Sequence, residues 1–341
     1  MRKIKKCRVY DDSSSFRFLP DEVVLLILNK LIDFKTLCLC KLVSTRFNLI
    51  VHQVDTISFV VPPVYSFDSI PPTDVGFHKK LLQFFFKPFH LLHGVVVALS
   101  KRHVPALFFE WGFFQSAIDS MSRFRRLKSL SMELPSTKKH LINCTFLYKW
   151  KIKFSNKVES FLFLSPNSVY NTAGLSNVNE IGLEQELEDP DLHEKKFDLA
   201  FDGLLDATVR YRMLMGYIVD FPLLENVLIT QSGKRGSVSC SGRNIVEMRK
   251  WLCSPADGIE HKLDDCTDFP CRLSHCYVPL LKLPFSGYLM KGVTLYLMER
   301  KDLRDGDKSF MNINMDDFED KEEAAYGEAM MEMLKKLRSQ I

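Results

Sequence analysis

The feature that most constrains this chain is a run of six apolar residues at positions 23–28, near its N-terminal end. Pro20, Asp21 and Glu22 predict that a helix begins just before this run, because proline suits the first helical turn and acidic side chains favour the positive end of the helix dipole. Successive helical residues point about 100° apart, so the run covers the whole circumference of the helix. Such a helix needs a covering surface on every side.

Two further short helices are expected directly after the first. Asp33 is placed to cap a helix over residues 35–41, and Ser44 is placed to cap another over residues 45–51. Three helices in about 35 residues make a unit too small to bury so much apolar surface within itself. We therefore expect this unit to pack against the rest of the chain, against another protein, or against both.

Beyond residue 53 the apolar pattern changes from helical spacing to strand alternation. Mixed strands and helices favour an α/β fold with a mostly parallel sheet. The strands resemble the repeated cores of leucine-rich repeats, yet their starts follow no fixed period of about 20–29 residues. An irregular leucine-rich-repeat-like domain and an ordinary α/β domain both remain open. The expected strands are 54–61, 127–134, 158–165, 178–183, 224–229 and 292–297, and the expected helices are 79–99, 106–124, 202–219, 244–252 and 318–338.

Composition excludes several classes of protein. Apolar residues make up 46% of the chain, which is enough for a large core, and the net charge of +4 is too small for a dominant nucleic-acid-binding surface. The most apolar window, 81–99, contains Lys87, so we expect no membrane span. Residues 1–15 are charged and serine-rich, which predicts a flexible basic tail rather than a signal peptide. We expect a nuclear or cytoplasmic protein, whose nine cysteines are reduced.

Few residues suggest chemistry. Cys266, Cys271, His275 and Cys276, with His261 upstream, form the one metal-like cluster, but their spacing is not that of a standard zinc site. No nucleophile motif and no phosphate-binding loop is complete. We therefore expect no cofactor, no metal and no enzyme activity. Two alternatives stay open: nucleic-acid binding through the basic N-terminus, and metal binding through the Cys266–Cys276 cluster.

The N-terminal helical unit resembles the F-box motif. The resemblance spans residues 16–53 and rests on Leu19-Pro20-Asp21-Glu22, on the leucines that end the first helix, and on Val43-Ser44-Thr45-Arg46-Phe47. Phe47 stands where tryptophan is common in the family, and the usual proline near Ile32 is lacking. Beyond the motif the chain is similar to plant F-box proteins, whose leucine-rich-repeat-like C-terminal region corresponds to residues 54–341. The stretches that carry this similarity are 51–55, 221–230 and 283–293.

The resemblance implies a function in protein degradation. F-box proteins bind a Skp-type linker protein, and through it the cullin and RING subunits of an SCF-type ubiquitin ligase, while the C-terminal domain holds a protein substrate. The sequence does not identify that substrate or its binding residues. The positions that match the family's linker-binding or helix-orienting residues are Leu19, Pro20, Ile27, Leu28, Leu31, Leu37, Cys40, Val43, Ser44 and Phe47.

Overall fold

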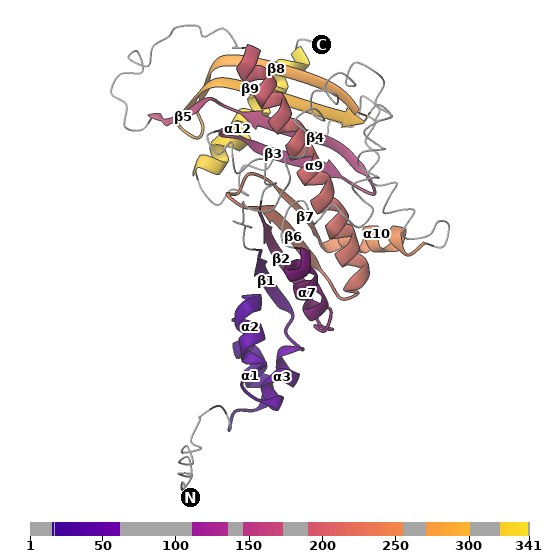
Figure 1. Ribbon diagram of the computed structural model, residues 1–341. Helices are drawn as coiled ribbons and strands as arrows, with labels where there is room; N and C mark the ends of the chain where they lie inside the picture. The colour runs from indigo at the N-terminus through magenta and orange to yellow at the C-terminus, as the bar shows by residue number, and fades with distance from the viewer. Residues whose placement is uncertain are drawn as a thin grey trace, which may run out of the picture.

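The computed structural model describes residues 16, 18–61, 111–135, 146–172, 190–254, 271–300 and 321–339. Three short helices lie at one end of the molecule, and two sheets with their covering helices form the rest (Figure 1). The expected basic tail, the helix at 79–99 and the strand at 178–183 lie outside the described residues. No helix among the described residues is both long enough and apolar enough to span a membrane.

The three N-terminal helices form where the sequence predicts them. They are α1 (Asp21–Leu28), α2 (Phe34–Cys40) and α3 (Thr45–Val51). The Asp33 carboxylate accepts a hydrogen bond from the Thr36 backbone N–H at 2.8 Å, and the Ser44 hydroxyl accepts one from Phe47 N–H at 3.2 Å. These two caps satisfy amide groups that the first turn of a helix leaves without intrahelical partners.

The first sheet continues from the helices. It contains β1 (Thr56–Val60), β2 (Ser129–Leu134), β6 (Asn226–Gln231) and β7 (Ser237–Ser241), in that order. The pairs β1–β2 and β2–β6 are parallel, whereas β6–β7 is antiparallel. Buried and more exposed residues alternate along each strand, so one face of the sheet is buried. The helices α7 (Trp111–Met121), α9 (Pro190–Asp220) and α10 (Gly242–Leu252) lie on that side (Figure 1).

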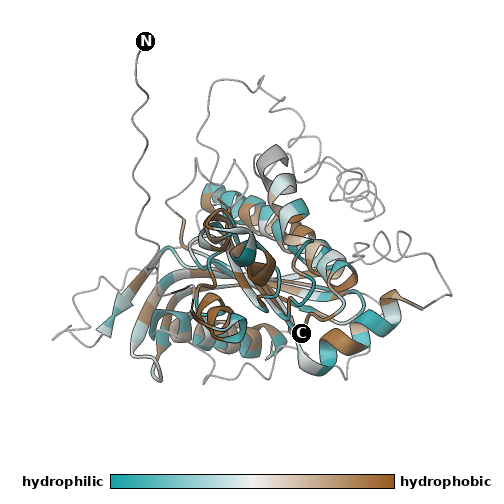
Figure 2. Ribbon diagram, turned by 90° about the horizontal axis from the view of Figure 1, so that it is seen from below, coloured by the Kyte–Doolittle hydropathy of each residue, from teal (hydrophilic) through white to brown (hydrophobic). Residues whose placement is uncertain are grey.

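The second sheet is antiparallel and lies between two helices. Its strands are β3 (Lys149–Phe154), β4 (Val158–Ser165), β5 (Ser168–Asn171), β8 (Cys271–Leu283) and β9 (Tyr288–Arg300). On β4, Phe161 and Phe163 belong to the same core as α9, while Leu162 and Leu164 pack with α12 (Lys321–Ser339). Figure 2 shows hydrophobic and hydrophilic residues alternating along the strands and helices, which is the pattern that such layers require.

The prediction of a mostly parallel sheet is wrong. Parallel pairing is confined to β1–β2 and β2–β6 among the described strands, and the whole second sheet is antiparallel. The physical reason is the length of the connections. Only residues 155–157 join β3 to β4, and only residues 284–287 join β8 to β9. A connection this short makes a hairpin, since a parallel pair needs a crossover of about a dozen residues or more.

Most of the other predicted elements are confirmed, with shifted ends. The predicted strands at 54–61, 127–134, 158–165 and 224–229 correspond to β1, β2, β4 and β6, and 292–297 lies within β9. The helix predicted at 202–219 begins at Pro190, and the one at 318–338 is α12. The sequence patterns missed β3, β5, β7 and β8. A leucine-rich-repeat-like architecture is not confirmed, since only three described strands share parallel pairing.

Candidate functional site

The inner side of the three N-terminal helices is part of the main core. Its side chains pack under β1 and the loop before β2, where the Phe34 ring lies 5.3 Å from the Phe59 ring and 6.2 Å from the Phe124 ring, between centroids. One continuous cluster of buried residues runs from these helices into both sheets. The buried residues that the helices contribute are Val24, Leu28, Phe34, Leu37, Ile50 and Val51.

The outer side of the same helices is apolar and exposed. Leu26 is 66% exposed, Leu42 81% and Val43 67%. Large apolar side chains scattered singly over a surface are normal, but a set this dense on one small unit is typical of surfaces that a partner covers. The described part of the chain covers the apolar first helix on one side only, as the small size of the helical unit predicts. We call the exposed set the apolar surface: Val23, Leu26, Ile27, Leu31, Ile32, Leu39, Leu42, Val43 and Leu49.

Arg46 fixes the segment that enters this unit. Its guanidinium donates to the Asp21 carboxylate, with a 2.7 Å bond from Nε, and to the backbone oxygens of Phe16 and Leu19. The Phe16 ring packs edge-on against the Phe47 ring, at 6.0 Å between centroids. The planar guanidinium presents donors in several fixed directions, which suits one side chain to several acceptors. Arg46 thus holds the start of α1 against α3.

The ten residues predicted from the F-box resemblance fall into three groups. Leu28 and Leu37 are fully buried among residues of this chain, so they support the helices and are not on the apolar surface. Leu19, Cys40 and Phe47 are half-buried, and burial raises the pKa of the Cys40 thiol. The exposed group is Pro20, Ile27, Leu31, Val43 and Ser44. Their roles in binding a linker remain predictions.

The resemblance missed several of the most exposed residues. Leu26, Leu39, Leu42 and Leu49 are each more than half exposed and were not among the predicted positions. The signal for Leu42 was available, because two apolar residues follow the end of α2 where a turn normally carries polar residues. Around α1 no such signal exists, since a helix that is apolar all round does not mark its outer side.

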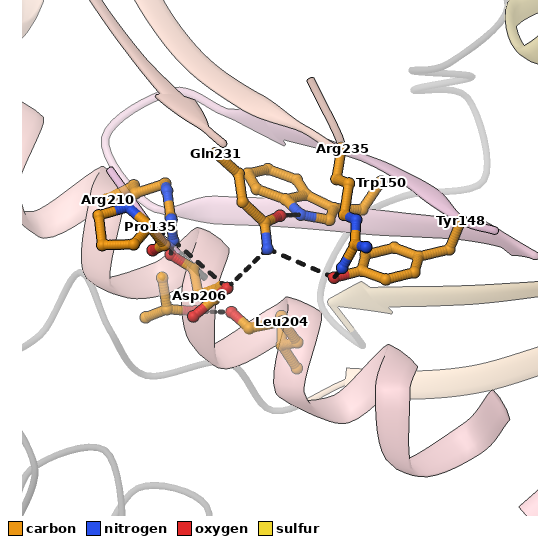
Figure 3. A network of polar contacts seen from close by, with 9 residues as sticks. Pro135, Tyr148, Trp150, Leu204, Asp206, Arg210, Gln231 and Arg235 are labelled. Atoms are coloured by element: carbon orange, nitrogen blue, oxygen red, sulfur yellow. Dashed lines mark hydrogen bonds and ion pairs between the residues drawn. The ribbon is translucent and has the colours of Figure 1, made fainter. Parts of the chain in front are cut away.

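A second site, a network of polar side chains, lies at the junction of the two sheets (Figure 3). The Gln231 side chain on β6 accepts a 2.6 Å hydrogen bond from the Trp150 indole N–H and donates to Asp206 Oδ2 at 3.1 Å. Asp206 and Arg210 are one turn apart on α9 and form an ion pair at 3.6 Å. Arg210 also donates to the Pro135 backbone oxygen at 3.1 Å. The network therefore joins α9 to strands of both sheets.

Burial sets the electrostatics of this junction. Asp206 and Arg210 are almost inaccessible to solvent, and no described residue donates a hydrogen bond to Asp206 Oδ1. Burial raises the pKa of Asp206 to about 6, although Arg210 opposes the shift. The Gln231 amide and the Arg210 guanidinium contact the carboxylate, and neither of them is a nucleophile. The geometry indicates a structural joint.

The described residues do not support the metal alternative. No group of three His, Cys, Asp or Glu side chains in the described part of the chain is arranged to bind a metal. Cys276 is buried on β8, whereas His275 on the same strand is exposed. Successive strand residues point to opposite faces, so these two side chains diverge. Cys266 and His261 lie outside the described residues.

Comparisons with known proteins agree with the N-terminal motif. A family model described as F-box-like matches residues 16–55. The chain is 22% identical to F-box protein AUF1 of Arabidopsis thaliana over 330 residues, which is 95% of this chain and 97% of that protein. It is 24% identical to F-box protein AUF2 of the same plant, over 83% of this chain and 84% of the relative. No solved structure matches the chain.

Proposed function

The chain carries an F-box-like domain and is similar to plant F-box proteins over most of its length, and we propose from this that it is the substrate-binding subunit of an SCF-type ubiquitin ligase. In this proposal a Skp-type linker covers the apolar surface and connects the chain to the cullin and RING subunits. The α/β domain that follows binds a protein substrate. The chain itself makes and breaks no covalent bond.

The observation that carries the proposal is the apolar surface. It lies within the residues that the F-box-like model matches, and it includes side chains as exposed as Leu42 and Val43. Exposed apolar area costs about 25 cal/mol for each Å² that stays in water, so covering it favours association. A protein partner is the cover that the small helical unit needs.

The second supporting observation is the continuous core. The cluster that includes Val24 and Leu28 in α1 also includes Phe161 and Tyr296 in the second sheet. Close-packed protein interiors are hardly compressible. The shared core therefore holds the three helices in a fixed orientation relative to the α/β domain. A ligase subunit of this kind works by proximity, because it raises the effective concentration of a substrate lysine near the charged conjugating enzyme.

Binding to a purified Skp-type linker tests the proposal. We expect Leu42→Asp to weaken binding by about 2 kcal/mol or more, roughly thirty-fold in Kd, because an apolar anchor is replaced by a charge that must be desolvated. The affinity is measured by calorimetry with the full chain. Leu223→Asp is the matched control, because Leu223 is 51% exposed on the loop after α9 and lies outside the three helices.

Melting temperature and linker affinity together separate a loss of binding from a loss of folding. Both variants should keep the wild-type melting temperature, since both side chains project into solvent. Linker binding that is lost only in Leu42→Asp supports the proposal. A wild-type chain that does not bind the linker, or a Leu42→Asp variant that binds it as tightly as wild type, contradicts it.

A further inference from the structure

Three basic side chains gather around one buried ring where α2, α3 and the loop before β2 meet. The ammonium Nζ of Lys41 lies 4.6 Å from the centroid of the Phe124 ring, and the His52 ring packs edge-on against the same ring at 5.6 Å between centroids. Arg123 is close enough to lower the pKa of both Lys41 and His52. Arg125 and Arg126 follow in the same exposed loop.

The described residues provide no ion-pair partner for these basic side chains. No ion pair joins Lys41, Arg123, Arg125 or Arg126 to a carboxylate within the described part of the chain, and no described residue hydrogen-bonds to the buried Nε2 of His52. Burial is the main cause of the lowered Lys41 and His52 pKa values. Arg123 lowers the pKa of both groups further, whereas Cys38 opposes the shift of the Lys41 pKa. Such packing of like charges opposes the charged forms. A bound anion would relieve this repulsion.

The cluster and the apolar surface share the chain segment at the end of α2. Lys41 directly follows α2 and stands in the chain between Leu39, which is 58% exposed, and Leu42, which is 81% exposed. Protein interfaces commonly have an apolar centre and a charged, solvent-accessible rim. The position and the charge of the cluster both fit such a rim. We call Lys41, Arg123, Arg125 and Arg126 the cationic rim. The His52 ring, whose pKa is lowered from 6.5, lies beside them and is mostly uncharged at neutral pH.

We propose that the cationic rim extends the linker-binding surface and binds carboxylate side chains of the Skp-type linker. The inference rests on the proposed function, and it adds the chemistry of the partner: an acidic segment beside an apolar face. The Lys41 ammonium, held against Phe124, and the exposed arginine side chains donate to the carboxylates. Their positive field also attracts these carboxylates before contact and speeds association.

A protein carboxylate fits this site better than a nucleic-acid phosphate. The neighbouring residues are large aliphatic side chains, whereas protein–nucleic acid interfaces are more polar and much more positive. Three arginines stand within four residues of this loop, whereas the chain as a whole has a net charge of only +4. The site therefore combines local charge with exposed leucines, as a protein partner requires.

Salt dependence of linker binding tests the inference. The full chain and the purified linker are mixed at about 50 mM and about 500 mM NaCl, and association and dissociation rates are measured. We expect Arg123→Glu combined with Arg126→Glu to lower the association rate roughly tenfold at low salt and to have little effect at high salt, because salt screens rim charges. Arg272→Glu combined with Lys282→Glu is the charge-matched control, since both residues are exposed on β8, at the opposite end of the molecule from the three helices (Figure 1).

The association rates of the two double variants decide between the outcomes. We call Arg123→Glu combined with Arg126→Glu the loop variant. If only this variant associates more slowly than wild type, and only at low salt, the result supports the inference. Equal rates for the two double variants overturn it, and leave the proposed function intact as long as the wild-type chain binds the linker. A labelled DNA duplex and a labelled RNA oligonucleotide form the second arm. If the loop variant loses nucleic-acid binding while keeping its wild-type rate with the linker, the rim binds nucleic acid and the inference is wrong.

Discussion

Asp206 is a buried carboxylate with a hydrogen bond to only one of its two oxygens among the described residues. Its Oδ2 accepts a hydrogen bond from Gln231, while Oδ1 has no hydrogen-bond partner within the part of the chain that the structure describes. Burial raises its pKa from 3.8 to about 6, so the folded protein holds a proton that the unfolded chain releases between these values. The folded state therefore loses stability as pH rises from about 4 to about 6. Two pKa units correspond to roughly 3 kcal/mol.

Replacing Asp206 by Asn should remove this part of the pH dependence. The free energy of unfolding of Asp206→Asn, minus that of the wild type, should rise by roughly 3 kcal/mol between pH 4 and pH 7, because the variant has no proton to lose there. Urea unfolding at each pH measures this difference. Glu247→Gln on α10 is the control, because Glu247 is exposed and its variant should track the wild type. Parallel curves for Asp206→Asn would contradict the assignment.

At the scale of elements, one buried glutamate ties α12 to the β8–β9 hairpin. Glu328 accepts hydrogen bonds from Phe285 N–H at 3.0 Å and from Ser286 N–H at 2.8 Å, and from the Ser286 hydroxyl at 2.6 Å. Its side chain is almost wholly buried. We expect Glu328→Gln to destabilise the protein by about 1–3 kcal/mol, since an amide NH₂ would face donors where an acceptor is needed.

Hydrogen exchange locates this effect. The amides of Phe285 and Ser286 should exchange faster in Glu328→Gln, while amides of the first sheet stay protected. Glu332→Gln, one turn further along α12, removes only a partly exposed pair with Lys335 and should cost less than about 0.5 kcal/mol. Equal protection of the hairpin amides in both variants would mean that Glu328 does not hold the turn.

Strands could be predicted where apolar and polar residues alternate along the sequence. β2 was predictable because Leu130, Met132 and Leu134 alternate with more polar residues. β3 was not predicted, because its three lysines, Lys149, Lys151 and Lys153, are typical of an exposed segment. In the structure the Lys149 ammonium lies 5.7 Å from the centroid of the Tyr326 ring on α12, so a long side chain covers apolar surface while keeping its charge near water.

The candidate site shows the same limit. The three helices and both caps could be predicted, because cap residues and apolar runs are local signals. The separation of buried Leu28 and Leu37 from exposed Leu26 and Leu42 could not, because it depends on where β1 and Phe124 lie in space. The cationic rim could not be predicted either, because it brings Lys41 close to residues 123–126, which are more than 80 positions away in the sequence.

At the scale of the whole molecule, the two sheets meet at a close backbone contact. The Trp150 N–H on β3 donates to the Arg235 oxygen at 2.8 Å, just before β7 begins. The Trp150 ring covers Gly236 and is itself buried against Phe161, at 6.1 Å between ring centroids. A Cβ atom at position 236 would lie 2.2 Å from two ring carbons of Trp150. Only glycine allows this approach.

Gly236→Ala should therefore weaken the joint between the sheets. We expect a loss of about 1–3 kcal/mol in the free energy of unfolding, because a buried indole has no room to move aside and overpacked cores are strained. Gly216→Ala on α9 is the opposite case, since nothing lies within 4 Å of the added Cβ. Alanine favours the helix over glycine there, so that variant should gain up to about 1 kcal/mol.

The pair of glycine variants also separates stability from linker binding. The apolar surface lies on the three helices at one end of the molecule, whereas the joint lies between the two sheets (Figure 1). Gly236→Ala should therefore bind a Skp-type linker with an affinity within about twofold of wild type, at a temperature where both remain folded. An unchanged melting temperature would show that Trp150 is free to shift. A large loss of linker affinity would show instead that the joint and the three helices are coupled through their shared core.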